Sequence, residues 1–267
     1  MLRPTPQRII LGVSVLLLAG VASADGLADL QSALQILQAQ EKIQAQVISE
    51  FAETRDPDDP KRSGFVRFQL TDDHHGLQVH YDRETLRKLE QERQLRTQNE
   101  DADTPTLNAL SRLDAIDLNA MVAAAANLQR SLQRAEFISE QPRLVDGKPV
   151  RTLRFALPLE AVLQDKKTRG YVSSFDAHLE IDIDERGVPL TLRRQYHGKG
   201  RAYLVISIEA YGQQTERFQV INNRLISIHN HSESGWRSTF GDGNTVSQRA
   251  LTVATDSELA ITGVVTP

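Results

Sequence analysis

The feature that most constrains the fold is the alternation of apolar and polar residues that runs from Glu136 to Val253. A period of two is typical of strands that bury one face. Asp146-Gly147 and Asn222-Asn223 are typical of two-residue hairpin turns, in which both central positions need a positive φ. A short helix is expected over 159–166. The sequence therefore predicts a long antiparallel meander in this half of the chain.

Three further turns set the predicted pairing within the meander. A turn at 184–187 places Ile181 opposite Leu190, and Leu179 opposite Leu192. A turn at 211–213 brings Phe218 opposite Ile206, and Val220 opposite Leu204. A glycine-rich bend around Trp236, Gly241 and Gly243 separates the last two strands, which are expected over 225–231 and 247–253.

The first part of the mature chain reads differently. Apolar residues at helical spacing predict a helix over 27–37, and strands are expected over 43–51, 65–70 and 77–81. A helical block follows over 82–135, with helix starts at Asp82, Thr104 and Asp117. One apolar stripe runs along its last helix: Leu118, Met121, Val122, Ala125, Leu128 and Leu132. We therefore predict an α+β domain over 25–267, with a curved antiparallel sheet covered by the inserted helical block.

Residues 1–24 have the layout of a secretory signal peptide. Arg3 and Arg8 precede an apolar run over 9–21, and Ala22-Ser23-Ala24 is a typical cleavage site. The apolar run is shorter than the roughly 20 residues that a spanning helix needs. We therefore expect cleavage between Ala24 and Asp25 and no membrane-spanning segment in the mature protein. The expected compartment is the periplasm, with secretion as the alternative.

Composition narrows the class of function. The chain has no cysteine, which excludes disulfides, thiol catalysis and zinc–thiolate sites. Its formal net charge is −4 and no lysine or arginine cluster marks a phosphate track, so nucleic acid is not an expected partner. No glycine-rich phosphate loop follows a predicted strand, and no cofactor is expected.

The order of elements resembles the periplasmic lipoprotein-carrier superfamily, which is LolA-like and RseB-like. The segments that carry the resemblance are 42–51, Gly64-Phe65-Val66-Arg67-Phe68, and the hairpin 183–192 with its Gly187-Val188-Pro189-Leu190. The resemblance implies a half-barrel closed by helices and a hydrophobic concavity. Such a concavity would receive a lipid, a lipoprotein acyl chain or a segment of an envelope protein.

The residues that would line this concavity follow from the predicted pairing. The expected apolar ligand-binding face comprises Leu118, Met121, Val122, Ala125 and Leu128 on the helices, with Leu204, Ile206, Ile208, Phe218 and Val220 on the sheet. The sequence leaves open whether these residues form a cavity wall or a packed core.

An envelope hydrolase is the alternative function. His229 and His231 share a strand face, and the predicted pairing places Glu216 opposite His229, which gives a conceivable metal site of two histidines and one carboxylate. Ser232, Ser234 and Ser238 lie near these histidines in the sequence. No G-x-S-x-G motif is present, and a non-enzymatic binding protein is the favoured interpretation.

Overall fold

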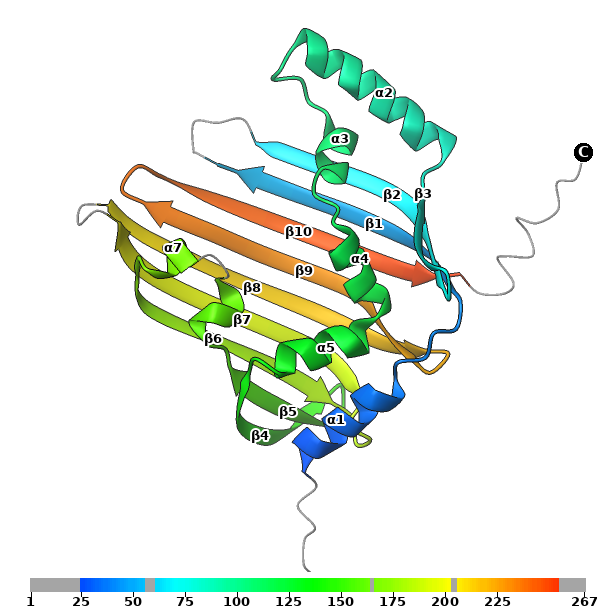
Figure 1. Cartoon of the computed structure of the whole chain (residues 1–267), viewed down its shortest axis with the longest axis vertical. Helices are drawn as coiled ribbons and strands as arrows, with labels where there is room; N and C mark the ends of the chain where they lie inside the picture. The colour runs from blue at the N-terminus through cyan, green and yellow to red at the C-terminus, as the bar shows by residue number, and fades with distance from the viewer. Residues whose placement is uncertain (1–24, 56–60, 164–165, 203–205, 255–267) are drawn as a thin grey trace, which may run out of the picture.

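The computed structural model describes residues 25–55, 61–163, 166–202 and 206–254. The predicted signal peptide and Leu204 lie outside these ranges. Ten antiparallel strands form one open sheet in the order β3-β2-β1-β10-β9-β8-β7-β6-β5-β4, and helices lie across one of its faces (Figure 1). The predicted α+β class and the curved antiparallel sheet are confirmed.

The strands are β1 (Ile43–Thr54), β2 (Arg62–Asp73), β3 (Gly76–His80), β4 (Glu136–Val145), β5 (Lys148–Ala156), β6 (Val172–Ile183), β7 (Pro189–Ala202), β8 (Ile206–Ile221), β9 (Arg224–Ser238) and β10 (Gly241–Val253). The helices are α1 (Gly26–Ile36), α2 (Arg83–Gln98), α3 (Pro105–Leu110), α4 (Ala115–Val122), α5 (Ala124–Leu132), α6 (Leu159–Val162) and α7 (Lys166–Arg169). Among the described residues, no helix is long and apolar enough to cross a membrane.

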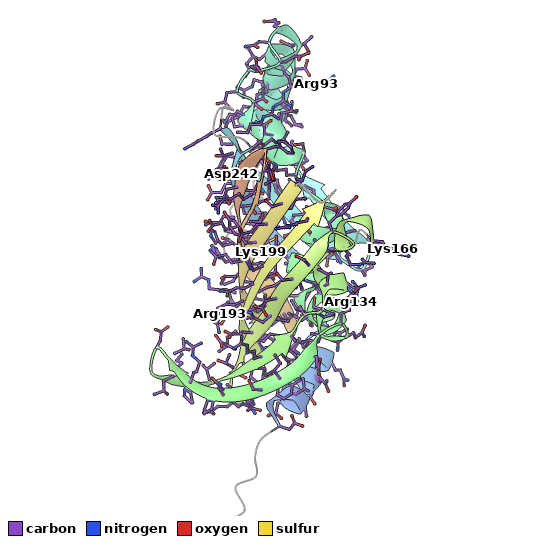
Figure 2. The ribbon with its side chains drawn as sticks, turned by 90° about the vertical axis from the view of Figure 1, so that its left-hand side faces the viewer. Arg93, Arg134, Lys166, Arg193, Lys199 and Asp242 are labelled. Atoms are coloured by element: carbon purple, nitrogen blue, oxygen red, sulfur yellow. The ribbon has the colours of Figure 1, made fainter. Side chains whose placement is uncertain are left out.

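The helices cover one of the two faces of the sheet. We call the face that they cover the inner face and the opposite one the outer face. Figure 2 shows the sheet nearly edge-on, with Arg134 and Lys166 on the helical side and Arg193 on the other. Alternation along each strand explains this division, since β1 buries Ile43, Ala45 and Val47 and turns the residues between them outward.

Two apolar clusters hold the helices on the inner face. One joins α1 and α5 to β5–β9 and includes Leu34, Leu128, Phe155 and Leu179. The other joins α3 and α4 to β1, β2, β9 and β10. Helix α2 contacts α3, where the Glu92 carboxylate accepts hydrogen bonds from the backbone amides of Thr106 and Leu107.

The two tight hairpin turns are confirmed, but two predicted registers are wrong. Asp146 and Asn222 have positive φ, as the turns require. Ile181 pairs with Leu192 rather than Leu190, and Leu179 with Arg194 rather than Leu192. One residue of this shift arises at Ile183, which pairs with Pro189, and the bulge next to it adds the second. The predicted turn at 211–213 does not exist, because β8 runs through it without a break.

The predicted bend between the last two strands is present but tighter than expected: the turn lies at 239–240, and Trp236 and Gly243 face each other within the β9–β10 ladder. The helix predicted to carry the apolar stripe is interrupted at Ala123, whose backbone is not helical, and it forms two helices, α4 and α5. There the guanidinium of Arg224 donates a hydrogen bond to the carbonyl of Val122, which an uninterrupted helix would use internally. Helix α4 is capped by Asp114 rather than Asp117.

Candidate functional site: the open end of the inner face

The predicted apolar face is divided between the two clusters. Leu118, Met121 and Val122 lie in the cluster on β1, β2, β9 and β10, whereas Ala125 and Leu128 lie in the cluster that also contains Phe218. All six side chains are buried. Beneath α4 and α5, these residues form packed core.

The remaining predicted residues do not meet these helices. Ile208 and Phe218 are ten residues apart on one continuous strand, which separates them by roughly 33 Å. Ile206 and Ile208 are half-buried and belong to neither cluster, and Val220 is exposed. The expectation that one helical block covers both ends of β8 is therefore wrong. We call the end near Phe218 the covered end and the end near Ile208 the open end.

A small apolar pocket lies at the open end. Its volume is about 100 Å³, and apolar atoms form nearly all of its surface. Leu163 and Tyr171, which flank α6 and α7, line one side of it. The sheet contributes Val172, Phe175, Tyr196, Gly198, Lys199, Gly200, Ile208 and Ala210. Of the predicted binding residues, Ile208 lines this pocket.

Glycines shape the floor of the open end. A Cβ atom on Gly212 would lie 2.3 Å from the Tyr196 ring, and one on Gly198 would lie 3.4 Å from the Phe175 ring. Glycine at position 212 therefore leaves room for the Tyr196 ring to lie against the backbone, whereas the Phe175 ring is at ordinary contact distance from position 198. Neither Tyr196 nor Phe175 was identified as a pocket residue from the sequence. The available signal was a glycine within a strand pattern, which can mark a place where a ring from a neighbouring strand lies close to the backbone.

The apolar surface continues from the pocket across β9. Ala210 lines the pocket and pairs with Trp236, whose indole lies against Gly243 on β10. Trp236 is 42% exposed, and it is the one tryptophan of the sequence. Its fluorescence therefore reports on whatever occupies this surface.

A polar band separates the open end from the covered end. Glu216 accepts hydrogen bonds from Gln214 (2.8 Å) and Ser227 (3.2 Å), and its side chain is buried. Burial raises the pKa of Glu216, against the opposing effects of the Arg194 charge and the Ser227 hydrogen bond. Burial also lowers the pKa of Arg194, and its Nε atom has no hydrogen-bond partner.

The candidate metal site is not assembled. Glu216 pairs with Asn230, whereas His229 pairs with Arg217, because a bulge shifts the β8–β9 ladder; the predicted pairing is therefore wrong. Desolvation lowers the pKa of His229, and the charges of Arg217 and His231 lower it further. Within the described residues, no three histidine or acidic side chains are grouped to hold a metal ion.

The serines that lie near these histidines in the sequence are on the opposite face. Ser232 pairs with Gln214 and its hydroxyl contacts that of Ser247, while His231 pairs with Thr215 on the outer face. The sheet therefore separates the hydroxyl groups from the imidazoles.

Comparison with known proteins adds little to this geometry. No protein family and no curated protein matches the sequence. Among solved structures, the chain is similar to a chain of the Pseudomonas aeruginosa MucA/MucB complex, with 9% sequence identity and a TM-score of 0.23. The similarity covers 85% of this chain and 93% of that one. A TM-score this low transfers no residue and no function to this chain.

Proposed function

We propose that this chain is an exported, non-enzymatic binding protein, and that it holds an acyl-bearing ligand, a lipid or a lipoprotein, at the open end of the inner face. The apolar pocket carries the proposal. An apolar cavity of about 150 Å³ admits a benzene molecule, so a pocket of about 100 Å³ suits the end of an acyl chain. The rest of the ligand's acyl chain would lie along Ala210 and Trp236.

The division of the inner face supports this placement. Beneath α4 and α5 the space is packed core, and opening it would expose leucines that are almost fully buried. At the open end, ligand binding needs no such disruption. An apolar side chain of an envelope protein partner has the same chemistry as a chain end, and it is the alternative occupant.

Fluorescence of Trp236 tests the site. Titration of the purified protein with a fatty acid at micromolar concentrations is expected to change the emission, and an organic extract of protein from its native host is expected to contain lipid. Ile208→Lys places a charge at the pocket and should abolish the change. Ile116→Lys, at a position that is 74% exposed on α4, is the matched control. Lipid-free extracts together with unchanged emission would contradict the proposal.

Export is tested separately. The Asp25 side chain caps α1 through the amides of Leu27 and Ala28, so the helix begins directly after the predicted cleavage site. The protein should occur in the periplasmic fraction of the native host. Its amino-terminal sequence should begin at Asp25. An intact Met1 in a membrane fraction would contradict export with cleavage.

A further inference from the structure

The two edges of the sheet differ in a way that concerns assembly. Strand β3 forms one edge with five residues, and β4 forms the other with ten. No residue of β4 is buried, and it carries four large exposed hydrophobic side chains: Phe137 (39%), Ile138 (54%), Leu144 (75%) and Val145 (38%). A long edge with exposed apolar side chains is a template for pairing with another strand.

The backbone of β4 offers the groups that such pairing needs. Asp146-Gly147 is a two-residue turn, so Val145 and Lys148 form a hydrogen-bonded pair across it. Every second residue before Val145, which means Arg143 and Gln141, likewise directs its backbone N–H and C=O groups toward β5. Leu144, Pro142 and Glu140 therefore turn their backbone groups outward. Proline has no N–H to donate, which fits an outward position at an edge. Ile138 has no Cα partner on β5, since the ladder is shifted there.

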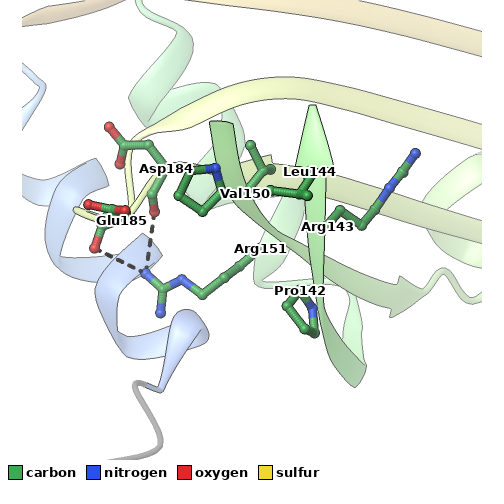
Figure 3. A pocket seen from close by; sticks show the side chains of 8 residues that line it. Pro142, Arg143, Leu144, Val150, Arg151, Asp184 and Glu185 are labelled. Carbon is green, nitrogen blue, oxygen red and sulfur yellow. Dashed lines mark hydrogen bonds between the residues drawn. The ribbon is translucent and has the colours of Figure 1, made fainter. Parts of the chain in front are cut away.

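The side chains of β4 are self-complementary. Ile138 and Leu144 lie symmetrically about Gln141, so that an antiparallel copy would place Ile138 opposite the partner's Leu144. Phe137 lies beyond the bulge at Ile138, where its ring packs against Phe155 of the same chain, and it takes no part in this match. Pro142, Leu144, Pro149 and Val150 line a hollow of about 510 Å³. Figure 3 shows Leu144 and Val150 close together at this hollow. The partner's Ile138 would lie next to this hollow.

Neighbouring registers fit less well. A two-fold axis perpendicular to the sheet keeps every residue on its own face, so only shifts that preserve the face are allowed. Centring on Glu140 puts two carboxylates opposite each other, and centring on Pro142 puts two residues without N–H donors opposite each other. Centring on Gln141 avoids both, and it leaves about six backbone hydrogen bonds between the copies.

From these observations we infer that two copies of this chain associate through their β4 edges, antiparallel and centred on Gln141, so that their sheets become continuous. The interface lies at the edge of the sheet, away from the pocket at the open end. It does not depend on the proposed ligand.

A single cysteine tests the register. The sequence contains no cysteine, so Gln141→Cys introduces the one thiol. The two copies of Gln141 would form a non-hydrogen-bonded pair with Cα atoms about 4.5 Å apart, within the range for a disulfide. Under mild oxidation this variant should form a covalent dimer much faster than Arg143→Cys, which lies opposite the partner's Ser139. Equal rates for the two variants, or faster cross-linking of Arg143→Cys, would overturn the register.

Analytical ultracentrifugation of the mature protein tests the association itself. The unmodified protein is expected to show a concentration-dependent dimer, and Leu144→Lys should weaken it by about tenfold or more. Leu144 is mostly exposed, so the variant should keep its circular dichroism spectrum and melting temperature. Phe240→Lys, at a position 76% exposed in the β9–β10 turn, is the matched control and should leave the dimer unchanged. A monomer at every concentration, or a dimer that Leu144→Lys leaves intact, would overturn the inference.

Discussion

The two ends of β8 share one strand and one face, yet their side chains pack in different ways. At the covered end, Phe218 is buried with Leu128 and Leu225 in a closely packed cluster. At the open end, Ile208 borders a pocket, and rings lie against glycines. The difference shows that coverage by helices, and not the strand pattern, decides which part of an apolar face becomes packed core and which part keeps an open pocket.

The largest effect should follow loss of the buried ion pair at the covered end. Arg224 contacts Asp72 and also donates hydrogen bonds to the carbonyls of Val122 and Glu41. Arg224→Met leaves the Asp72 carboxylate buried without its countercharge, and should lower the free energy of unfolding by about 3–5 kcal/mol in urea titrations. The double variant Arg224→Met, Asp72→Leu removes both charges and should recover part of the loss. A loss below 1 kcal/mol in the single variant would show that the covered end tolerates an unpaired charge.

A cavity at the covered end should have the next largest effect. Leu128 is 2% exposed in the cluster with α1 and β5–β9. Leu128→Ala should therefore destabilise the protein by about 2–5 kcal/mol, measured by the same unfolding experiment. The amount of lipid that co-purifies with each folded molecule should be the same as for the unmodified protein. If this variant instead lost its ligand while keeping its stability, the ligand site would lie beneath α5 and the comparison of the two ends would be reversed.

Truncation at the open end should cost much less. Ile208 is half-buried and borders the pocket, so Ile208→Ala removes few packed contacts. We expect a loss of about 1 kcal/mol or less in unfolding free energy, together with weaker binding of fatty acid in the Trp236 titration. A loss as large as that of Leu128→Ala would mean that the open end is also core.

The smallest effect should come from the polar band between the two ends and should depend on pH. Because burial raises the pKa of Glu216 above its ordinary value of 4.5, the folded protein binds more protons than the unfolded protein between the two pKa values. The stability that protonated Glu216 contributes is complete below pH 4.5 and is lost as pH rises through the pKa of the folded state. Relative to the unmodified protein, Glu216→Gln should therefore gain stability as pH rises from 4.5 to 8.

The exposed Glu100→Gln variant is the control for this titration. Its difference in unfolding free energy from the unmodified protein should stay nearly constant over the same pH range. A parallel profile for Glu216→Gln would show that the Glu216 carboxyl is not part of a desolvated band.

Local patterns predicted the elements of this fold well, because alternation and turn chemistry act over a few residues. The strand that begins at Ile43 and the turn at Asn222-Asn223 follow from sequence directly. Gly212 and Gly243 were misread as turn signals, because their roles are to face the rings of Tyr196 and Trp236 on neighbouring strands. No local pattern contains that information.

The candidate site was predicted only in part for the same reason. Ile208 was identified from its alternating strand, but a false turn four residues later brought it beside the wrong helices. Leu163 and Phe175, which complete the pocket, come from a short helical segment and from β6. Their proximity depends on the order of strands across the sheet, which short-range periodicity does not reveal.

The pairing of the first strand with the last has a consequence for how the chain acquires its fold. Ala45 pairs with Val253, so the two meanders, β1–β3 and β4–β10, are joined in the sheet through β1 and β10. Contacts between residues so distant in sequence form slowly, because a long loop must close before they do. Until β10 has been made, β1 and β9 each keep one unpaired edge. A chain with this topology completes its sheet only once its last strand is available, so the strand order makes folding wait for the end of synthesis.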